Sequence, residues 1–405
     1  VLEKKGDSTI WHNSQKVKLP KPLANGVSIS TPKGVLCFGG DNEEGIYNDV
    51  FLLKWDSENK TIKIEFLPSI PIPLANMGGD LVDDIVYLVG GQKKKDQKST
   101  KTFLSFSIES SLIRSAYTWE ILPNIPGKDR IQPLVVGQSN GHQNCLYVMS
   151  GLSFNPADDL PYEMLADVYE YNPNKIKWTK KKLIPNNDTQ GVDGGYLAAA
   201  PIIKKGDSHI LIFGGAGGKG QHLFKRLIID RKIKELKNEG DVNDSINTEI
   251  NNLMLMSEEL LKTTYFSKTI WAYHTITDTW TRKGELKEKT QVVSNAVDWG
   301  EYIVIPGGEV SPGVRTNKIT KIILKPFKAS FGLANYITLI FYLVLIVFIG
   351  WYFSKRNKTI DDYFLGGGRI PWWAAGLSIY ATMLSAITYL SQPALAYSFD
   401  WQAYL

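Results

Sequence analysis

A short apolar run ending in a glycine pair recurs along this chain, and it limits the possible folds more than any other feature. The runs are VLCFGG (35–40), IVYLVGG (85–91), CLYVMSG (145–151), ILIFGG (210–215) and YIVIPGG (302–308). In the third run Ser150 replaces the first glycine. Another apolar run precedes each, and an alternating strand follows, such as DVYEYNP from Asp167. A Trp-led strand closes several units, as at Trp119, Trp178 and Trp280.

Four short strands per unit, at a repeat of about fifty residues, are typical of β-propeller blades. We therefore predict an all-β propeller over residues 1–327. A glycine pair suits a backbone turn beside a neighbouring strand, where a Cβ atom would collide with that strand. The units resemble the Kelch repeat, with its double glycine and later aromatic positions.

The two ends of the repeat region bear on the number of blades. The chain opens with the end of a strand and a Trp-led strand at Trp11, which resembles the back half of a blade. Residues 292–325 supply three strands without a Trp-led strand after them. We therefore predict a propeller of the six-bladed type that is truncated at its N-terminus by roughly one blade. The alternative is a closed five-bladed ring, in which the Trp11 strand pairs with residues 319–324.

The fourth unit carries a long insertion, at about 227–266, between its second and third strands. Its second half has a helical period, with apolar residues at Ile246, Ile250, Leu253, Met256 and Leu260. The insertion is expected either to pack as a flap on the blade edge or to form a lid over the propeller mouth.

Composition excludes several classes of function. The net charge is +5 and the basic residues are scattered, the densest run being 93–95, so nucleic-acid binding is not expected. Cys37 and Cys145 lie in apolar runs and are expected to be small buried hydrophobes. The five histidines form no metal-like cluster, so we predict neither a metal nor a cofactor for the propeller.

Two further motifs narrow the class of propeller. GGEVSPGVRT places Glu309 and Arg315 six residues apart across a turn, and PGKDRIQ places Arg130 where an innermost strand begins. With the helical insertion, these motifs resemble the N-acetylneuraminate epimerase family, in its branch of cyclically permuted mutarotases. The resemblance implies that Glu309 and Arg315 are a catalytic pair. It also implies that Arg130 binds the carboxylate of a sugar acid.

The chemistry of such an isomerase is compatible with these residues. Mutarotation of a 2-keto sugar acid moves a proton between the ring oxygen and the anomeric hydroxyl, which a partly desolvated carboxylate can do. Guanidiniums suit the substrate carboxylate. Asn25, Asn76 and Gln291, at matching loop positions, are expected to line the same mouth. The alternative is that Glu309 and Arg315 form a surface salt bridge in a blade-connecting loop.

Residues 335–353 contain no charged side chain. A helix of this length crosses the roughly 30 Å apolar core of a bilayer. Lys355, Arg356 and Lys358 follow it, which favours a cytoplasmic location for that loop and an extracytoplasmic propeller, periplasmic in a Gram-negative bacterium. We therefore expect a protein of the inner (plasma) membrane, multi-pass in its full length.

The region 328–405 resembles the start of the sodium:solute symporter family. A basic loop, DDYF, a glycine run, PWW and a helix rich in small residues follow the first span, and a second span is expected at 371–392. The resemblance implies that the backbone carbonyls of Ala381 and Leu384 contact Na⁺, and that Ser385 and Thr388 hold the substrate carboxylate. Plain helix packing is the alternative for these small and hydroxylated residues. The resemblance implies that the other sodium ligands lie on a later helix, beyond residue 405.

These expectations combine into one hypothesis. The chain is read as part of a fusion between an extracytoplasmic sialic acid mutarotase and a Na⁺-coupled sialic acid symporter. The expected partners are a sugar acid, Na⁺ and the membrane, with no nucleic acid. One alternative is a non-catalytic Kelch module that captures a glycan or a protein beside the symporter. Another alternative changes only the substrate, to a different sugar.

Overall fold

The computed structural model describes most of the chain. The described residues are 2–5, 8–11, 18–56, 58–59, 61–95, 97–108, 118–158, 161–185, 195–216, 221–238, 244–263, 266–288, 291–311, 313–324, 332–355, 360 and 370–383. The chain divides into two compact units, Val1–Leu324 and Lys325–Leu405. Each unit is described by itself below.

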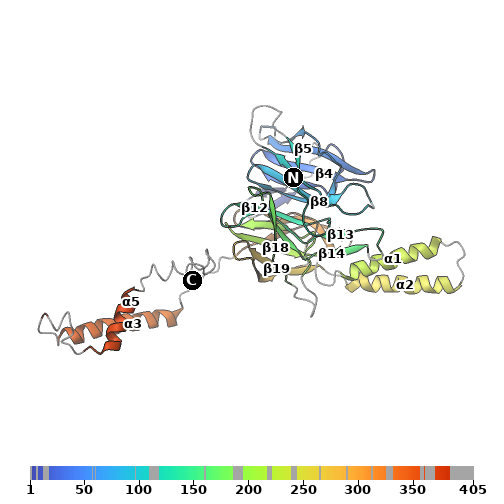
Figure 1. The fold of residues 1–405 in the computed structure, drawn as a ribbon. Coiled ribbons are helices and arrows are strands. Elements are labelled where there is room, and N and C mark those ends of the chain that lie inside the picture. Colours follow the sequence, from blue (N-terminus) through green and yellow to red (C-terminus); the bar gives the residue numbers. More distant parts are fainter. Residues whose placement is uncertain are drawn as a thin grey trace. The chain divides into compact units, whose positions relative to one another are not determined.

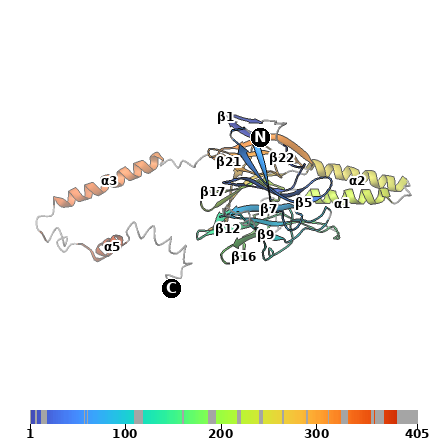
Figure 2. The same ribbon diagram turned by 90° about the horizontal axis from the view of Figure 1, so that it is seen from above.

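The first unit contains a five-bladed β-propeller built from antiparallel sheets that succeed one another along the chain (Figures 1 and 2). Blade 1 contains β3 (Val27–Thr31), β4 (Gly34–Asp41), β5 (Ile46–Asp56) and β6 (Thr61–Leu67); blade 2 contains β7 (Ala75–Val82), β8 (Ile85–Gln92), β9 (Phe103–Ser107) and β10 (Trp119–Ile121); blade 3 contains β11 (Leu134–Ser139), β12 (Asn144–Met149), β15 (Val168–Asn172) and β16 (Lys177–Lys181); blade 4 contains β17 (Ile202–Lys205), β18 (His209–Gly215), β19 (Ser267–His274) and β20 (Thr279–Glu285); blade 5 contains β21 (Val297–Asp298), β22 (Ile303–Ser311) and β23 (Val314–Ile322). The all-β propeller expected from the repeat is confirmed.

The ends of the propeller differ from the closed ring considered above. Strand β1 (Leu2–Lys5) pairs with β2 (Ser8–Trp11), with Leu2 opposite Trp11, as a separate two-stranded sheet. Within the described residues, β23 pairs with β22 alone. The Trp11 strand therefore does not join β23, and the alternative built on that pairing is wrong. A sixth blade is not found among the described residues, and its existence stays a prediction.

The glycine pairs adopt the backbone conformation that the repeat requires. Both members of each pair have positive φ, from 54° and 106° at Gly39 and Gly40 to 65° and 119° at Gly307 and Gly308. Ser150 takes the first position of the third pair at φ 55°, and its hydroxyl accepts a hydrogen bond from the Leu197 amide at 3.0 Å. Because positive φ is unfavourable for residues with a Cβ atom, this bond helps to hold the one non-glycine member.

We expect Gly40→Ala to lower the free energy of unfolding by at least about 2 kcal/mol. At φ 106° an added Cβ would lie 2.6 Å from the carbonyl oxygen of Ala24, which belongs to the rigid inner edge of blade 1. Chemical denaturation of the purified chain measures the effect. Gly45→Ala is the matched control, because a Cβ there meets nothing within 4 Å. Equal stability of the two variants would contradict the steric argument.

Tryptophans of the outermost strands join neighbouring blades. The indole Nε1 of Trp119 donates to the Pro68 carbonyl at 3.1 Å, and Trp178 donates to Pro123 at 3.1 Å. Trp280 donates to the Lys182 carbonyl at 3.3 Å. Each of these bonds reaches from one blade to the end of the preceding one, so the Trp-led pattern in the sequence marks the contacts between blades.

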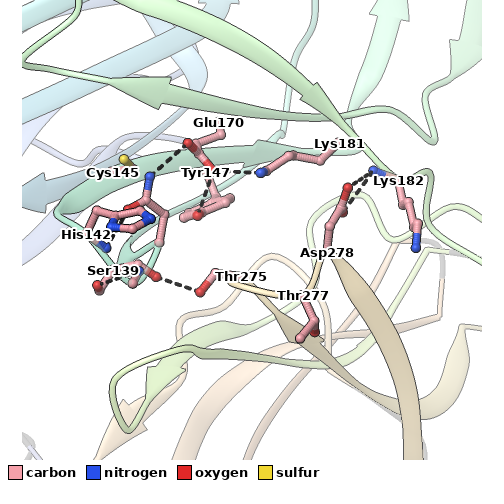
Figure 3. A network of polar contacts seen from close by, with 12 residues as sticks. Ser139, His142, Cys145, Tyr147, Glu170, Lys181, Lys182, Thr275, Thr277 and Asp278 are labelled. Carbon is pink, nitrogen blue, oxygen red and sulfur yellow. Dashed lines mark hydrogen bonds and ion pairs between the residues drawn. The ribbon is translucent and has the colours of Figure 1, made fainter. Parts of the chain in front are cut away.

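Polar contacts add to the junction of blades 3 and 4, at the face where the first and second strands of each blade turn (Figure 3). The Tyr147 hydroxyl donates to Glu170 at 2.9 Å, and Lys181 forms an ion pair with the same carboxylate at 3.0 Å. The Thr275 hydroxyl donates to the Ser139 carbonyl at 2.5 Å. Cys145 beside them is fully buried, and burial raises the pKa of its thiol to about 11. The Thr275–Ser139 bond joins blade 4 to blade 3, whereas the contacts of Glu170 lie within blade 3.

Two of the loops between second and third strands are enlarged. Blade 3 carries the small hairpin β13 (Leu152–Phe154) and β14 (Tyr162–Met164). Blade 4 carries two packed helices, α1 (Gln221–Asn238) and α2 (Asp244–Thr263), which Figures 1 and 2 show side by side. The helical period of the sequence covered only the second of these helices. Whether the pair acts as a lid stays a prediction.

The second unit contains α3 (Leu333–Ser354) and α5 (Trp372–Met383). Among the described residues, one helical stretch, Leu333–Tyr352, is long and apolar enough to cross a membrane, with a mean hydropathy of 2.3. It contains most of the predicted first span. The predicted second span, 371–392, begins one residue before α5, and its part after Met383 lies outside the described residues.

Candidate functional site

Five residues, one from each blade, form a chain of backbone hydrogen bonds around the propeller axis. They are Asn25, Asn76, Gln132, Ala199 and Val293, each at or shortly before the start of the first strand of its blade and each with φ between 50° and 57°. The amide of each member after Asn25 donates to the carbonyl of the preceding member, at 2.8, 2.7, 3.3 and 2.9 Å in chain order. We call these five residues the inner ring. Because all five residues share this left-handed backbone conformation, their side chains occupy equivalent positions around the propeller axis.

A cavity of about 410 Å³ lies at the inner ring. Its polar side is formed by the carboxamides of Asn25, Asn76 and Gln132, together with Arg315 from blade 5. Apolar lining residues come from every blade, and those of blades 4 and 5 are Ala199, Ala200, Ile202 and Val293. A cavity with both polar and apolar lining residues suits a small polar ligand that also carries an apolar group.

The carboxamides are oriented by their neighbours. Asn25 Nδ2 donates to Asp41 Oδ1 at 2.8 Å, and Asn76 Nδ2 donates to Gln92 Oε1 at 3.4 Å. Gln132 Nε2 lies 3.5 Å from Asn76 Oδ1. Asp41 and Gln92 occupy the same place in their blades, directly after the glycine pair. In blades 1 and 2, the residue at that position therefore accepts a hydrogen bond from the carboxamide of the ring member.

Glu309 occupies this same position in blade 5. Its backbone exchanges two hydrogen bonds of 2.9 Å with Val292, the residue before the ring member Val293. Its Cα partner on β23 is Arg315. Directly paired residues of an antiparallel sheet project to the same face, so the two side chains leave blade 5 together. The glycine turn thus places Glu309 opposite Arg315, and Arg315 lines the cavity.

The local environments of Glu309 and Arg315 differ. Glu309 is half-buried and its Oε1 accepts a hydrogen bond from the Gly313 amide at 2.7 Å. Arg315 is exposed and lines the cavity. Within the described residues no ion pair joins the two side chains, so the simple surface salt bridge considered above is not what the structure contains. The cation at the cavity is therefore not paired with the carboxylate on the neighbouring strand.

Arg130 has a different place from the one expected. Its side chain is fully buried, and its guanidinium forms a two-pronged ion pair with Asp167 at 2.8 and 2.9 Å. It also donates to the carbonyl of Ser150 at 3.0 Å. A guanidinium enclosed in this way does not reach a ligand in the cavity. The expected role as a carboxylate ligand is therefore corrected to a structural one.

Gln291 is corrected for a related reason. It is 3 % exposed, its Nε2 donates to the Lys318 carbonyl at 2.7 Å, and its Oε1 accepts from Thr320 at 2.5 Å. Both Arg130 and Gln291 precede a ring member by two residues, and both are buried. The cavity-facing residue in the PGKDRIQ motif is instead Gln132. Aligning all five repeats at the residue before the first strand would have found it.

The remaining predicted positions divide into two groups. Asn25 and Asn76 line the cavity, as the sequence indicated. Ala381 lies on α5 with an exposed side chain. Leu384, Ser385 and Thr388 lie outside the described residues, so their roles stay predictions.

Comparisons with known proteins find two kinds of relative. The profile of the N-acetylneuraminate epimerase family matches residues 67–335. The N-acetylneuraminate epimerase of Salmonella enteritidis PT4 is 27% identical over 253 residues, which cover 62% of this chain and 57% of the epimerase. The solved structure of YjhT matches with a TM-score of 0.43 and 20% identity, over 65% of this chain and 69% of that one.

The second kind of relative consists of transporters. The sodium/sialic acid symporter SiaT of Proteus mirabilis is 59% identical over 71 residues, which are 18% of this chain and 14% of the symporter. The symporter NanT of Aliivibrio fischeri is 58% identical over 72 residues, with the same coverage. The chain thus spans a small part of the symporters and little more than half of the epimerase. Because the family match covers well over half of the chain and includes the cavity-lining residues of blades 2 to 5, this protein belongs to the N-acetylneuraminate epimerase family.

Proposed function

We propose that the propeller interconverts the anomers of a nine-carbon 2-keto sugar acid of the N-acetylneuraminate type. The observation that carries this proposal is that Arg315 lines a cavity whose other polar side chains are neutral, while Glu309 is its direct partner on the neighbouring strand. The names of the epimerase relatives support the same class of substrate. The finer assignment of roles below is part of the proposal.

In this mechanism Glu309 moves the proton. Its carboxylate accepts the proton of the anomeric hydroxyl and delivers it to the ring oxygen as the bond between that oxygen and the anomeric carbon breaks, so the carboxylate is regenerated. The open keto form rotates and closes on its other face, with the proton transfers reversed.

Arg315 supplies the positive charge for the substrate carboxylate. Its planar guanidinium can form two parallel hydrogen bonds with a carboxylate. With Arg130 enclosed in the core, Arg315 is the cation among the described residues that line this cavity. The amides of Asn25, Asn76 and Gln132 are placed to bond hydroxyl or acetamido groups, and the wall of Ala199 and Val293 suits a methyl group.

Nuclear magnetic resonance of anomer exchange tests the function. The full chain in detergent, added to N-acetylneuraminate, is expected to raise the rate of exchange between anomer signals above the spontaneous rate. A chain that binds the sugar and leaves exchange at the spontaneous rate would instead be a glycan-capture module. The catalytic and glycan-capture hypotheses can therefore be distinguished in one sample, in which line broadening reports binding and the exchange rate reports catalysis.

Gln132→Ala is expected to raise KM about tenfold and to change kcat little, because it removes a neutral hydrogen bond to the bound sugar. The residue lines the cavity at the third position of the inner ring. Steady-state exchange rates over a range of sugar concentrations measure both constants. Gln143→Ala, in the turn between β11 and β12 at the opposite face, is the matched control. A purely structural role for Gln132 would lower stability and leave KM unchanged.

We further propose that the 71-residue symporter match lies in the apolar second unit, and that this unit is the start of a Na⁺-coupled carrier. In that case the propeller is extracytoplasmic and Lys355 is cytoplasmic. The carbonyls of Ala381 and Leu384 would contact the co-transported Na⁺, and Ser385 and Thr388 the sugar carboxylate. A mutarotase in the same chain as the carrier would produce the transported anomer close to the transporter that takes it up.

A further inference from the structure

A second cavity, of about 540 Å³, lies in the propeller beside the loop between β8 and β9. Three lysines of that loop, Lys93, Lys98 and Lys101, line it, and all three are exposed. Its apolar wall contains Pro71, Ile72 and Ile121, and the side chain of Ile121 is 80% exposed. The loop is of the same kind as the Glu309–Arg315 turn, between second and third strands. It therefore emerges on the face of the propeller that carries the inner ring.

The lysines of this cavity outnumber its carboxylates. Asp129 is the one acidic residue among the described residues that line it, and its Oδ2 accepts a hydrogen bond from the buried Ser99 hydroxyl. In the part of the chain that the structure describes, the three lysines have no carboxylate within ion-pair distance. With three ammonium groups and one carboxylate, the described lining of the cavity has a net positive charge beside its apolar wall.

The loop is held in place. Gln92 Nε2 donates to the Gln97 carbonyl at 2.7 Å, and the Thr100 amide donates to the Gly91 carbonyl at 2.9 Å. The Ser99 amide donates to the Phe154 carbonyl of the blade 3 hairpin at 2.8 Å. Gln92 also accepts from Asn76 of the inner ring, so one side chain separates the loop from the central cavity. A fixed loop loses little conformational entropy when a ligand binds.

We propose that this lysine cavity is an accessory site for an acidic oligosaccharide, which it holds next to the central cavity. Ammonium groups attract the carboxylates of such a saccharide as point charges, and the Ile72–Ile121 wall accepts the C–H face of a sugar ring. The inference rests on the proposed function for the class of sugar. It does not require the propeller to be a catalyst.

Binding of a defined trisaccharide tests the proposal. The full chain in detergent is titrated with the α2,8-linked trimer of N-acetylneuraminate and with neutral maltotriose. The variant Lys93→Gln/Lys98→Gln/Lys101→Gln is expected to weaken trimer binding at least about tenfold, as three exposed charge contacts of modest strength are lost. The matched control is Lys175→Gln/Lys177→Gln/Lys180→Gln, which removes three exposed lysines from the outer part of blade 3. It is expected to bind the trimer as the parent chain does.

Several outcomes decide between explanations. Retained trimer binding in the Lys93/Lys98/Lys101 variant, or equal binding of maltotriose, overturns the proposal. A variant that binds the trimer normally but loses binding to vesicles of anionic phospholipid would show a membrane contact instead, and it also overturns the proposal. Failure of the proposed catalysis is recognised separately. Glu309→Gln is expected to leave trimer binding unchanged, and the lysine variant is expected to exchange the anomers of the monomer at the parental rate.

Discussion

Glu309→Gln is expected to slow catalysed anomer exchange by about 10²- to 10⁴-fold, the usual contribution of a general acid–base group. The amide keeps the size of the side chain and can still contact Gly313, but it neither accepts nor returns a proton. Binding of N-acetylneuraminate should stay within a few-fold of the parent value, since Arg315 and the three amides are unchanged. Exchange spectroscopy gives the rate, and calorimetric titration gives the affinity.

Glu58→Gln is the matched control for this experiment. Glu58 is exposed in the turn between β5 and β6, at the face opposite to the inner ring, and the same loss of charge there should leave exchange unaltered. If Glu309→Gln retained the parental exchange rate, another group would have to move the proton. If both rate and affinity were lost together, Glu309 would be a binding residue.

Arg130→Met is expected to cost about 3 to 5 kcal/mol of folding free energy, because it leaves the Asp167 carboxylate without its partner. The Arg130 guanidinium is wholly enclosed, and it joins Asp167 to the loop before blade 3 by bonds of 2.8 and 2.9 Å. Chemical denaturation of the full chain, followed by tryptophan fluorescence, measures the loss. The double variant Arg130→Met/Asp167→Leu should recover part of it, because no charge is then left unpaired.

The exposed pair of Lys128 and Glu163 provides the matched control. It lies in the same region, joins the loop before blade 3 to the hairpin, and is more than half exposed at both side chains. Lys128→Met should change stability by no more than about 1 kcal/mol. A stable Arg130→Met chain that had lost only its affinity for the sugar would restore the ligand role that the sequence motif suggested.

The fold could be predicted because its tight turns and its contacts between blades require particular residue types, which recur in the sequence. Positive φ at two consecutive residues favours glycine strongly, so each inner turn left a mark in the sequence. The indole contacts at Trp119, Trp178 and Trp280 left another. The first helix of the insertion was missed because its charged residues obscure the apolar period, and its partner α2 covers it only in the folded chain.

The site was predicted in part, and the two wrongly placed residues are displaced by the same number of positions along the chain. Asn25 and Asn76 stand at the inner ring, whereas Arg130 and Gln291 stand two residues earlier, where side chains enter the core. A single left-handed residue before each first strand decides which position faces the cavity, and glycine does not mark it here. Arg130 was selected because it is charged, but its guanidinium forms an ion pair with Asp167. The neutral Gln132 carries no comparable signal.

The hydrogen bonds of the inner ring have a consequence for how such a protein changes over time. Successive members are joined by hydrogen bonds between backbone amides and carbonyls. The ring therefore does not depend on the identity of the side chain at each position. Asparagine, glutamine, alanine and valine all occupy equivalent places with nearly the same φ. Ligand preference can therefore be rewritten one blade at a time, by exchanging single residues, while the architecture that displays them is left intact.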